Sequence, residues 1–262
     1  MDPPPYSKNA NPPGQSDTAD NLIIAIDFGT TFTGVAFAHV GDAAYAVMSS
    51  GGMKRVAEKV TIVRSWPNQS VGTFFQKTPS CLSYNDPRRP DWGASVQSND
   101  KGKVANFKLG LQENVKNFYQ SVDNTQTSSV LGGFLTDHNW KHPELPNKTA
   151  VDFTADYLTE MYRHVRTTSL PLSYGNEYLS KQQMTFVLTV PAIWSDKAKE
   201  LTIQAATRAG IQKENLVLMT EPEAAAIYCA TLCAETDLRE GDIFLVCDAG
   251  GGTVVTLRTA WH

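Results

Sequence analysis

The sequence predicts an α/β fold in which helices cover the faces of a sheet, and three observations support that prediction. Compact apolar runs of strand length stand at residues 22–28, 186–190, 216–219 and 243–248. Segments with apolar residues at helical spacing separate the last three of these runs. Residues that favour helix ends mark where the helical segments begin and stop. An alternation of strand and helix is typical of α/β proteins, so we expect these strands to be buried.

The first strands are expected to follow a disordered tail. Residues 1–20 are rich in proline, asparagine, serine and aspartate and cannot bury an apolar face. Residues 22–28 and 34–40 then have the character of two strands, joined by the tight turn Gly29-Thr-Thr-Phe-Thr33. A third strand at residues 44–48 would complete a meander that opens the fold.

Three helix starts carry residues that favour capping. Thr149 can cap a helix with Asp152 at its third position, which is the spacing of a capping box. Ser195 can cap the next helix, and Gly210 would end it. Pro222 suits the first turn of a further helix that runs to about residue 233. The sequence between the meander and Thr149 is less regular, with one helix expected at residues 112–121.

Composition excludes several classes of protein. The 262 residues carry 23 Lys and Arg against 27 Asp and Glu, a net charge of -4. That balance argues against a broad basic groove, so we expect no nucleic-acid partner. No apolar run reaches the roughly 18–20 residues of a membrane span, and the N-terminus lacks the pattern of a secretory signal. We therefore expect a cytoplasmic protein without membrane association, whose four cysteines stay reduced.

Two segments repeat one order of residues: an apolar strand, an aspartate, one further residue, a glycine and a threonine. They are Ile26-Asp27-Phe28-Gly29-Thr30-Thr31 and Val246-Cys247-Asp248-Ala249-Gly250-Gly251-Gly252-Thr253. Glycine lets the backbone approach a phosphate, whose oxygens the N–H groups and threonine hydroxyls can bind. The aspartates could reach the water shell of Mg²⁺. Two such loops facing each other would clamp the β- and γ-phosphates of ATP.

Each glycine segment could instead be an ordinary hairpin, although that alternative is weaker for the pair than for either segment alone. Neither segment is a P-loop, because the stretch after Gly29 lacks the Lys-Ser/Thr that ends such a loop. The sequence also contains no G-x-G-x-x-G, so a Rossmann-type dinucleotide site is unsupported.

Glu221 is the third candidate for chemistry. It ends a short strand just before a helix, where a carboxylate could order a water molecule or a metal. The alternative is an acid placed at a helix start because the helix dipole favours it there. For Glu223 we predict only this second role, an acid at a helix start.

The segments that carry these motifs resemble the heat-shock protein 70 chaperones, within the wider superfamily of actin-like and sugar-kinase ATPases. The similar segments are IAIDFGTTFTGVAF, VPAIWSDKAKELTIQAATRAGI with LVLMTEPEAAAIY, and FLVCDAGGGTV. The similarity covers about residues 22–40 and 186–254 and is weak in between, which is typical of a divergent member. It implies one actin-like (ribonuclease H-like) ATPase lobe with a core at 21–55 and 148–238, an inserted variable subdomain at 56–147, and the start of a truncated second lobe at 239–262.

The resemblance also implies ATP and Mg²⁺ as cofactors and gives each matching residue a role. Asp27 and Asp248 would contact the water shell of the metal, and Glu221 would lie near the metal and the attacking water. The phosphates would be held by Gly29, Thr30, Thr31, Phe32, Gly250, Gly251, Gly252 and Thr253. The family also uses a lysine near the γ-phosphate. Lys108 is the candidate, with an exposed surface lysine as the alternative interpretation.

Two departures from the family pattern bear on activity. Val255 stands where the family has a further aspartate, and a valine cannot order water. The chain ends at His262, so we expect the adenosine pocket of the second lobe and the substrate-binding domain to be missing. Phosphoryl transfer depends on positioning and electrostatics, so we expect impaired ATP hydrolysis. The last strand would then leave an open edge and an apolar face.

The leading hypothesis is therefore a chaperone-type protein that binds ATP or ADP. In the full-length family, ATP hydrolysis is coupled to the binding of unfolded polypeptides, with co-chaperones as partners. Two alternatives stay open. One is a pseudo-ATPase that binds a partner through its exposed lobe, which Val255 and the early end favour. The other is a sugar or metabolite kinase of the same superfamily, although the Thr-Glu-Pro-Glu-Ala-Ala-Ala segment favours the chaperone.

Overall fold

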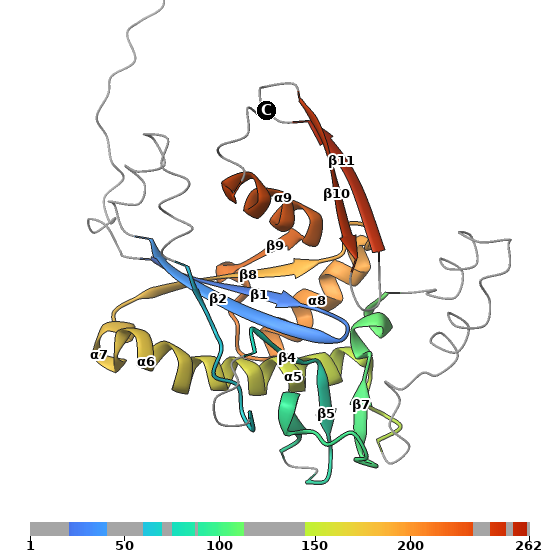
Figure 1. Cartoon of the computed structure of the whole chain (residues 1–262). Coiled ribbons are helices and arrows are strands. Elements are labelled where there is room, and N and C mark those ends of the chain that lie inside the picture. The colour runs from blue at the N-terminus through green and yellow to red at the C-terminus, as the bar shows by residue number, and fades with distance from the viewer. Residues whose placement is uncertain are drawn as a thin grey trace, which may run out of the picture.

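A mixed six-stranded sheet forms the centre of the molecule (Figure 1). The computed structural model describes residues 21–40, 60–69, 75–86, 89–112, 145–232, 242–249 and 254–260. The strands of the sheet are β1 (Asn21–Phe28), β2 (Phe32–Val40), β3 (Thr61–Ile62), β4 (Lys77–Pro79), β8 (Gln183–Val190) and β9 (Leu216–Thr220). Their order is β3-β2-β1-β8-β9, and β4 also pairs with β2. The pairs β1–β8 and β8–β9 are parallel, and the others are antiparallel.

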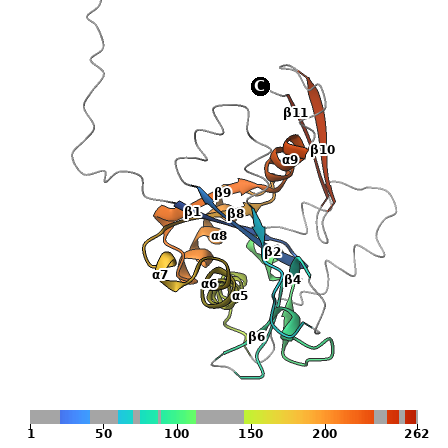
Figure 2. The same ribbon diagram turned by 60° about the vertical axis from the view of Figure 1, so that its left-hand side comes forward.

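Only one face of this sheet is fully covered by the described residues. Alternate side chains of β1 are at most 1% exposed, and the residues between them are half-buried. The buried face rests on α5 (Ala150–His164) and α8 (Asp196–Arg208), on the opposite side of the sheet from α9 (Glu221–Leu232) (Figure 2). The prediction of a sheet covered on its faces is therefore confirmed for one face within the described ranges. On the second face, among the described elements, α9 contacts β8 and β9.

The predicted helix ends are confirmed. The Thr149 hydroxyl accepts a hydrogen bond from the Asp152 N–H at 3.3 Å, and the Asp152 carboxylate accepts one from the Thr149 N–H at 2.7 Å. This is the expected capping box at the start of α5. The Ser195 hydroxyl accepts from the Ala198 N–H at 3.2 Å and starts α8. At the other end of α8, Gly210 has a φ of +93°, a conformation that glycine adopts without strain.

Helix α5 supports the strand that carries the predicted site. The Tyr157 ring on α5 lies 6.1 Å from the ring of Phe28 and 5.6 Å from the ring of Phe107, measured between centroids. Its hydroxyl donates a hydrogen bond to the carbonyl oxygen of Pro79 at 3.2 Å. After α5 the chain continues through η3 (Val165–Ser169, a π-helical turn), α6 (Leu170–Tyr174) and α7 (Asn176–Leu179), and η4 (Lys213–Asn215) precedes β9.

A second, three-stranded sheet lies beside the main one. Its strands are β5 (Cys81–Ser83), β6 (Asp91–Trp92) and β7 (Lys103–Ala105), in the antiparallel order β6-β5-β7. The short 3₁₀ helices η1 (Gly93–Ser95) and η2 (Phe107–Leu111) follow β6 and β7. All of these elements fall within the stretch predicted as an inserted subdomain, as do β3 and β4, which pair with the main sheet.

The last two strands stand apart from the main sheet. The antiparallel pair β10 (Ile243–Ala249) and β11 (Val254–Ala260) contacts α9 (Figure 1). Ile243 is 58% exposed and Leu245 is 66% exposed. The prediction of a buried strand at residues 243–248 is therefore wrong. Within the described ranges β10 pairs with β11 alone, which leaves the apolar side chains of β10 uncovered.

Three predictions lie outside the described residues: the tail at 1–20, the strand at 44–48 and the helix at 112–121 beyond its first residue. In the part of the chain that the structure covers, no helix combines the length and the apolar character needed to cross a membrane.

Candidate functional site

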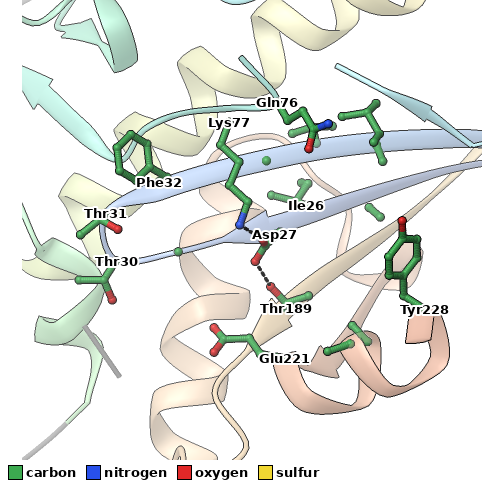
Figure 3. A pocket seen from close by; sticks show the side chains of 18 of the residues that line it. Ile26, Asp27, Thr30, Thr31, Phe32, Gln76, Lys77, Thr189, Glu221 and Tyr228 are labelled. Carbon is green, nitrogen blue, oxygen red and sulfur yellow. Dashed lines mark hydrogen bonds and ion pairs between the residues drawn. The ribbon is translucent and has the colours of Figure 1, made fainter. Parts of the chain in front are cut away.

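A cleft of about 690 Å³ opens on the less covered face of the main sheet (Figure 3). Its walls come from the β1–β2 turn, the start of β4, the end of β8 and the first turns of α9. The cleft brings together seven of the predicted site residues: Asp27, Gly29, Thr30, Thr31, Phe32, Lys108 and Glu221. Residues that lie far apart in the sequence therefore converge on one site.

The β1–β2 turn has a shape that requires glycine at its first position. The Gly29 N–H donates to the carbonyl oxygen of Phe32 at 3.1 Å. A Cβ atom on Gly29 would come closer than 3.0 Å to that same oxygen. Ser80 holds the turn from outside, because its hydroxyl donates to the Gly29 carbonyl at 2.7 Å and its N–H donates to the Thr31 carbonyl at 2.8 Å. The turn therefore has a fixed shape at the mouth of the cleft.

Lys108 is buried at the inner end of the cleft. Its side chain is 3% exposed, so the alternative of an exposed surface lysine is wrong. Its ammonium group donates to the Phe28 carbonyl oxygen and pairs with Oε1 of Glu221 at 2.6 Å. The rings of Phe28 and Trp194 lie 5.4 and 5.5 Å from Nζ. A buried ammonium group needs such partners, and these contacts fix Lys108 beside both the turn and Glu221.

Asp27 lies at the end of β1, and both of its carboxylate oxygens are engaged. Oδ2 pairs with Nζ of Lys77 at 2.6 Å, and Oδ1 accepts a hydrogen bond from the Thr189 hydroxyl at 3.2 Å (Figure 3). The predicted Mg²⁺ needs carboxylate oxygens that can bind the ion or its water shell. In this arrangement the side chains around Asp27 do not fit Mg²⁺, because Lys77 already supplies the positive charge.

No three His, Cys, Asp or Glu side chains of the described ranges come together as a metal cluster.

The two glutamates at the start of α9 have different surroundings. Glu221 faces Lys108, whereas Glu223 turns back to the helix start. The Glu223 carboxylate accepts hydrogen bonds from the Thr220 hydroxyl at 2.6 Å and from the Thr220 N–H at 3.0 Å. These bonds hold the pKa of Glu223 below its usual range. Glu223 thus caps its helix, in agreement with its predicted place as a helix-start acid.

Most of the second predicted phosphate loop lies outside the described residues. The residues concerned are Gly250, Gly251, Gly252 and Thr253. Asp248 belongs to β10, where it stands opposite Val255 of β11 in the strand register. The contribution of this loop stays a prediction.

Three residues that line the cleft were missed by the sequence reasoning: Lys77, Thr189 and Tyr228. Lys77 falls in the stretch where the family resemblance is weak, and its position depends on strand register. Thr189 offered a weak signal, since it is a hydroxyl residue within the apolar strand β8. Tyr228 on α9 is 61% exposed, and its ring forms part of the cleft wall (Figure 3).

No family model matches the chain. Individual proteins do: the chain is 26% identical over 216 residues to human heat shock 70 kDa protein 12A, covering 80% of this chain and 29% of that protein. It is 28% identical over 225 residues to human heat shock 70 kDa protein 12B, covering 81% of this chain and 28% of that protein. A segment of 79 residues is 38% identical to the chaperone protein dnaK of Thalassiosira pseudonana, covering 30% of this chain and 12% of that protein.

The chain thus spans less than a third of the length of these relatives. The similarity nevertheless extends over most of the chain and includes several heat-shock 70 proteins, which confirms the predicted resemblance. The chain is therefore similar to heat-shock 70 proteins over about four fifths of its length.

Proposed function

We propose that this chain binds ATP or ADP in the cleft, as a nucleotide-binding lobe of the actin-like type. The observation that supports this most strongly is the position of Lys108. It lies buried next to the glycine turn and is paired with Glu221, so that three separately predicted elements meet in one place. The relatives in the heat-shock 70 family support an ATPase relationship.

Different cleft residues would contact different parts of a bound triphosphate. The turn would present the N–H groups and hydroxyls of Thr30 and Thr31 to phosphate oxygens, and Gly29 would let the backbone approach them. Lys108 would place its ammonium charge near the terminal phosphate, since lysine binds phosphate as a point charge. These contacts bind and orient the nucleotide, and orientation with electrostatic stabilisation provides most of the catalysis in phosphoryl transfer.

Glu221 would act on water rather than on phosphate. One oxygen of its carboxylate is paired with Lys108 at 2.6 Å, and the side chain is 13% exposed to the cleft. A carboxylate held in this way can accept a hydrogen bond from a water molecule and orient it toward the terminal phosphate. The predicted Mg²⁺ would require Asp27 to release Lys77, and Val255 replaces a further aspartate of the family, so we propose that hydrolysis is slow.

One observation favours a second function, the binding of a protein partner. Four large apolar side chains on α9 and β10 are 51–66% exposed: Ile227, Tyr228, Ile243 and Leu245. Exposed apolar surface of this kind is typical of interaction sites. Nothing in the cleft favours the sugar-kinase alternative over these two.

Nucleotide binding can be tested by thermal unfolding of the chain with and without ATP in a buffer containing Mg²⁺. A ligand at 100 times its Kd adds about 2.7 kcal/mol to the stability, which corresponds to about 5–10 °C in Tm for a chain of this size. We expect such a shift, and we expect Thr31→Val to reduce it. Thr207→Val removes a hydroxyl from the exposed side of α8, outside the cleft, and is the matched control. An unchanged Tm in a cooperative transition would contradict the proposal.

A further inference from the structure

Lys77 reaches Asp27 because of the strand register. Lys77 of β4 pairs with Gly34 of β2, and Gly34 pairs with Asp27 of β1. The three residues therefore form one row across three neighbouring strands. The middle position has no side chain, and a Cβ atom there would lie only 3.2 Å from Cγ of Lys77. Gly34 thus leaves space for the lysine to cross β2 to the carboxylate. Figure 3 shows the ion pair that Lys77 then forms with Asp27.

The ion pair between Lys77 and Asp27 lies on the solvent-exposed side of the cleft. The side chains of Lys77 and Asp27 are 52% and 47% exposed, and both line the cleft. An ion pair that is half-exposed contributes little to stability, so the fold does not depend on it. The ammonium group of Lys77 is therefore free to contact a ligand in the cleft without disturbing the structure.

The charges of the cleft balance without a metal ion. Among the described residues that line it, Asp27 and Glu221 are the carboxylates, and Lys77 and Lys108 are the ammonium groups. Each lysine lies 2.6 Å from one carboxylate. A divalent cation at Asp27 would be placed next to the ammonium of Lys77, and like charges at this separation repel each other. A nucleotide phosphate chain would meet two ammonium groups, each held in place by the carboxylate paired with it.

We propose that Lys77 takes the place of the divalent cation, so that the cleft binds the phosphate chain of a nucleotide without Mg²⁺. This inference rests on the proposed nucleotide-binding function. It departs from the Mg²⁺ dependence that the heat-shock 70 resemblance implies. Asp27 then serves to orient Lys77, and Thr189 holds the second oxygen of Asp27 in place.

The test is an ATP titration by calorimetry on the whole chain, once with EDTA and once with Mg²⁺. We expect the unmodified chain to bind ATP in EDTA. Lys77→Met should weaken binding in EDTA by about tenfold or more, the loss expected for one hydrogen bond to a charged group. Added Mg²⁺ should restore binding to this variant, because the variant frees Asp27. Lys181→Met is the control, since Lys181 follows α7 and forms an exposed ion pair with Glu177 of that helix, outside the cleft.

Each other result overturns the inference in a recognisable way. Binding by the unmodified chain that requires Mg²⁺ would leave the proposed function intact and remove the role of Lys77. Equal ATP affinity of the unmodified chain and Lys77→Met in EDTA would do the same. An equal loss in EDTA and in Mg²⁺ would make Lys77 an ordinary phosphate contact. No binding by any form of the chain would contradict the proposed function itself.

Discussion

The Lys108→Met variant is expected to lose about 3–5 kcal/mol of unfolding free energy together with ATP binding. Lys108 is 3% exposed and supplies the positive charge that Glu221 faces. Methionine fills a similar volume but cannot donate to Glu221 or to the Phe28 carbonyl. A largely buried carboxylate and a carbonyl group would then be left without this partner, which is the costly way to break an ion pair of low exposure. Urea denaturation with a titration of ATP measures both losses.

A second variant separates stability from binding. In Lys108→Met/Glu221→Gln the unpaired charge is gone, so we expect part of the stability to return while ATP binding stays lost. Lys103→Met removes an exposed lysine from β7 and should change neither property. Full ATP affinity in the double variant would show that Lys108 does not contact the nucleotide.

The Gly29→Ala variant should distort the β1–β2 turn and lower both stability and ATP affinity. The added methyl group cannot fit next to the Phe32 carbonyl oxygen, so the turn must open. Opening weakens the 3.1 Å hydrogen bond from Gly29 to Phe32 and the contact from Ser80. We expect a loss of about 1–3 kcal/mol of stability, the range found for overpacked sites, and a loss of ATP affinity of about tenfold or more.

Gly175→Ala is a control whose expected loss of stability matches that of Gly29→Ala. Gly175 has a φ of +77° and open space around it, so alanine there should cost about 1–3 kcal/mol through backbone strain alone. Gly175 lies just before α7, outside the cleft, and ATP affinity should be unchanged. If the two variants lose ATP affinity equally, the effect of Gly29→Ala comes from lowered stability and the turn has no special role.

The features that were predictable from the sequence depend on residues close together in the chain. The Thr149–Asp152 capping box joins residues three apart, and the Ser195 cap reaches only to Ala198. The glycine turn likewise closes within residues 29–32. Local chemistry determines these structures, so the residue types alone identify them.

The features that could not be predicted depend on long-range pairing. Lys108 is buried because Phe28 and Trp194 cover it, and those residues lie far from it in the chain. Lys77 meets Asp27 through the register of three strands, which no local pattern encodes. The apolar run at residues 243–248 likewise indicates a strand but not which neighbours will cover it, so the run alone predicted burial where β10 is exposed.

The central claim is that ATP binds at the β1–β2 turn next to Lys108. The most direct test is a titration of the isotopically labelled chain with ATP, followed through its backbone amide NMR signals. We predict that the largest chemical-shift changes fall on Gly29, Thr30, Thr31 and Phe32, with further changes at Lys108 and Glu221. Saturable changes confined to residues outside the cleft, or no changes at all, would contradict the claim.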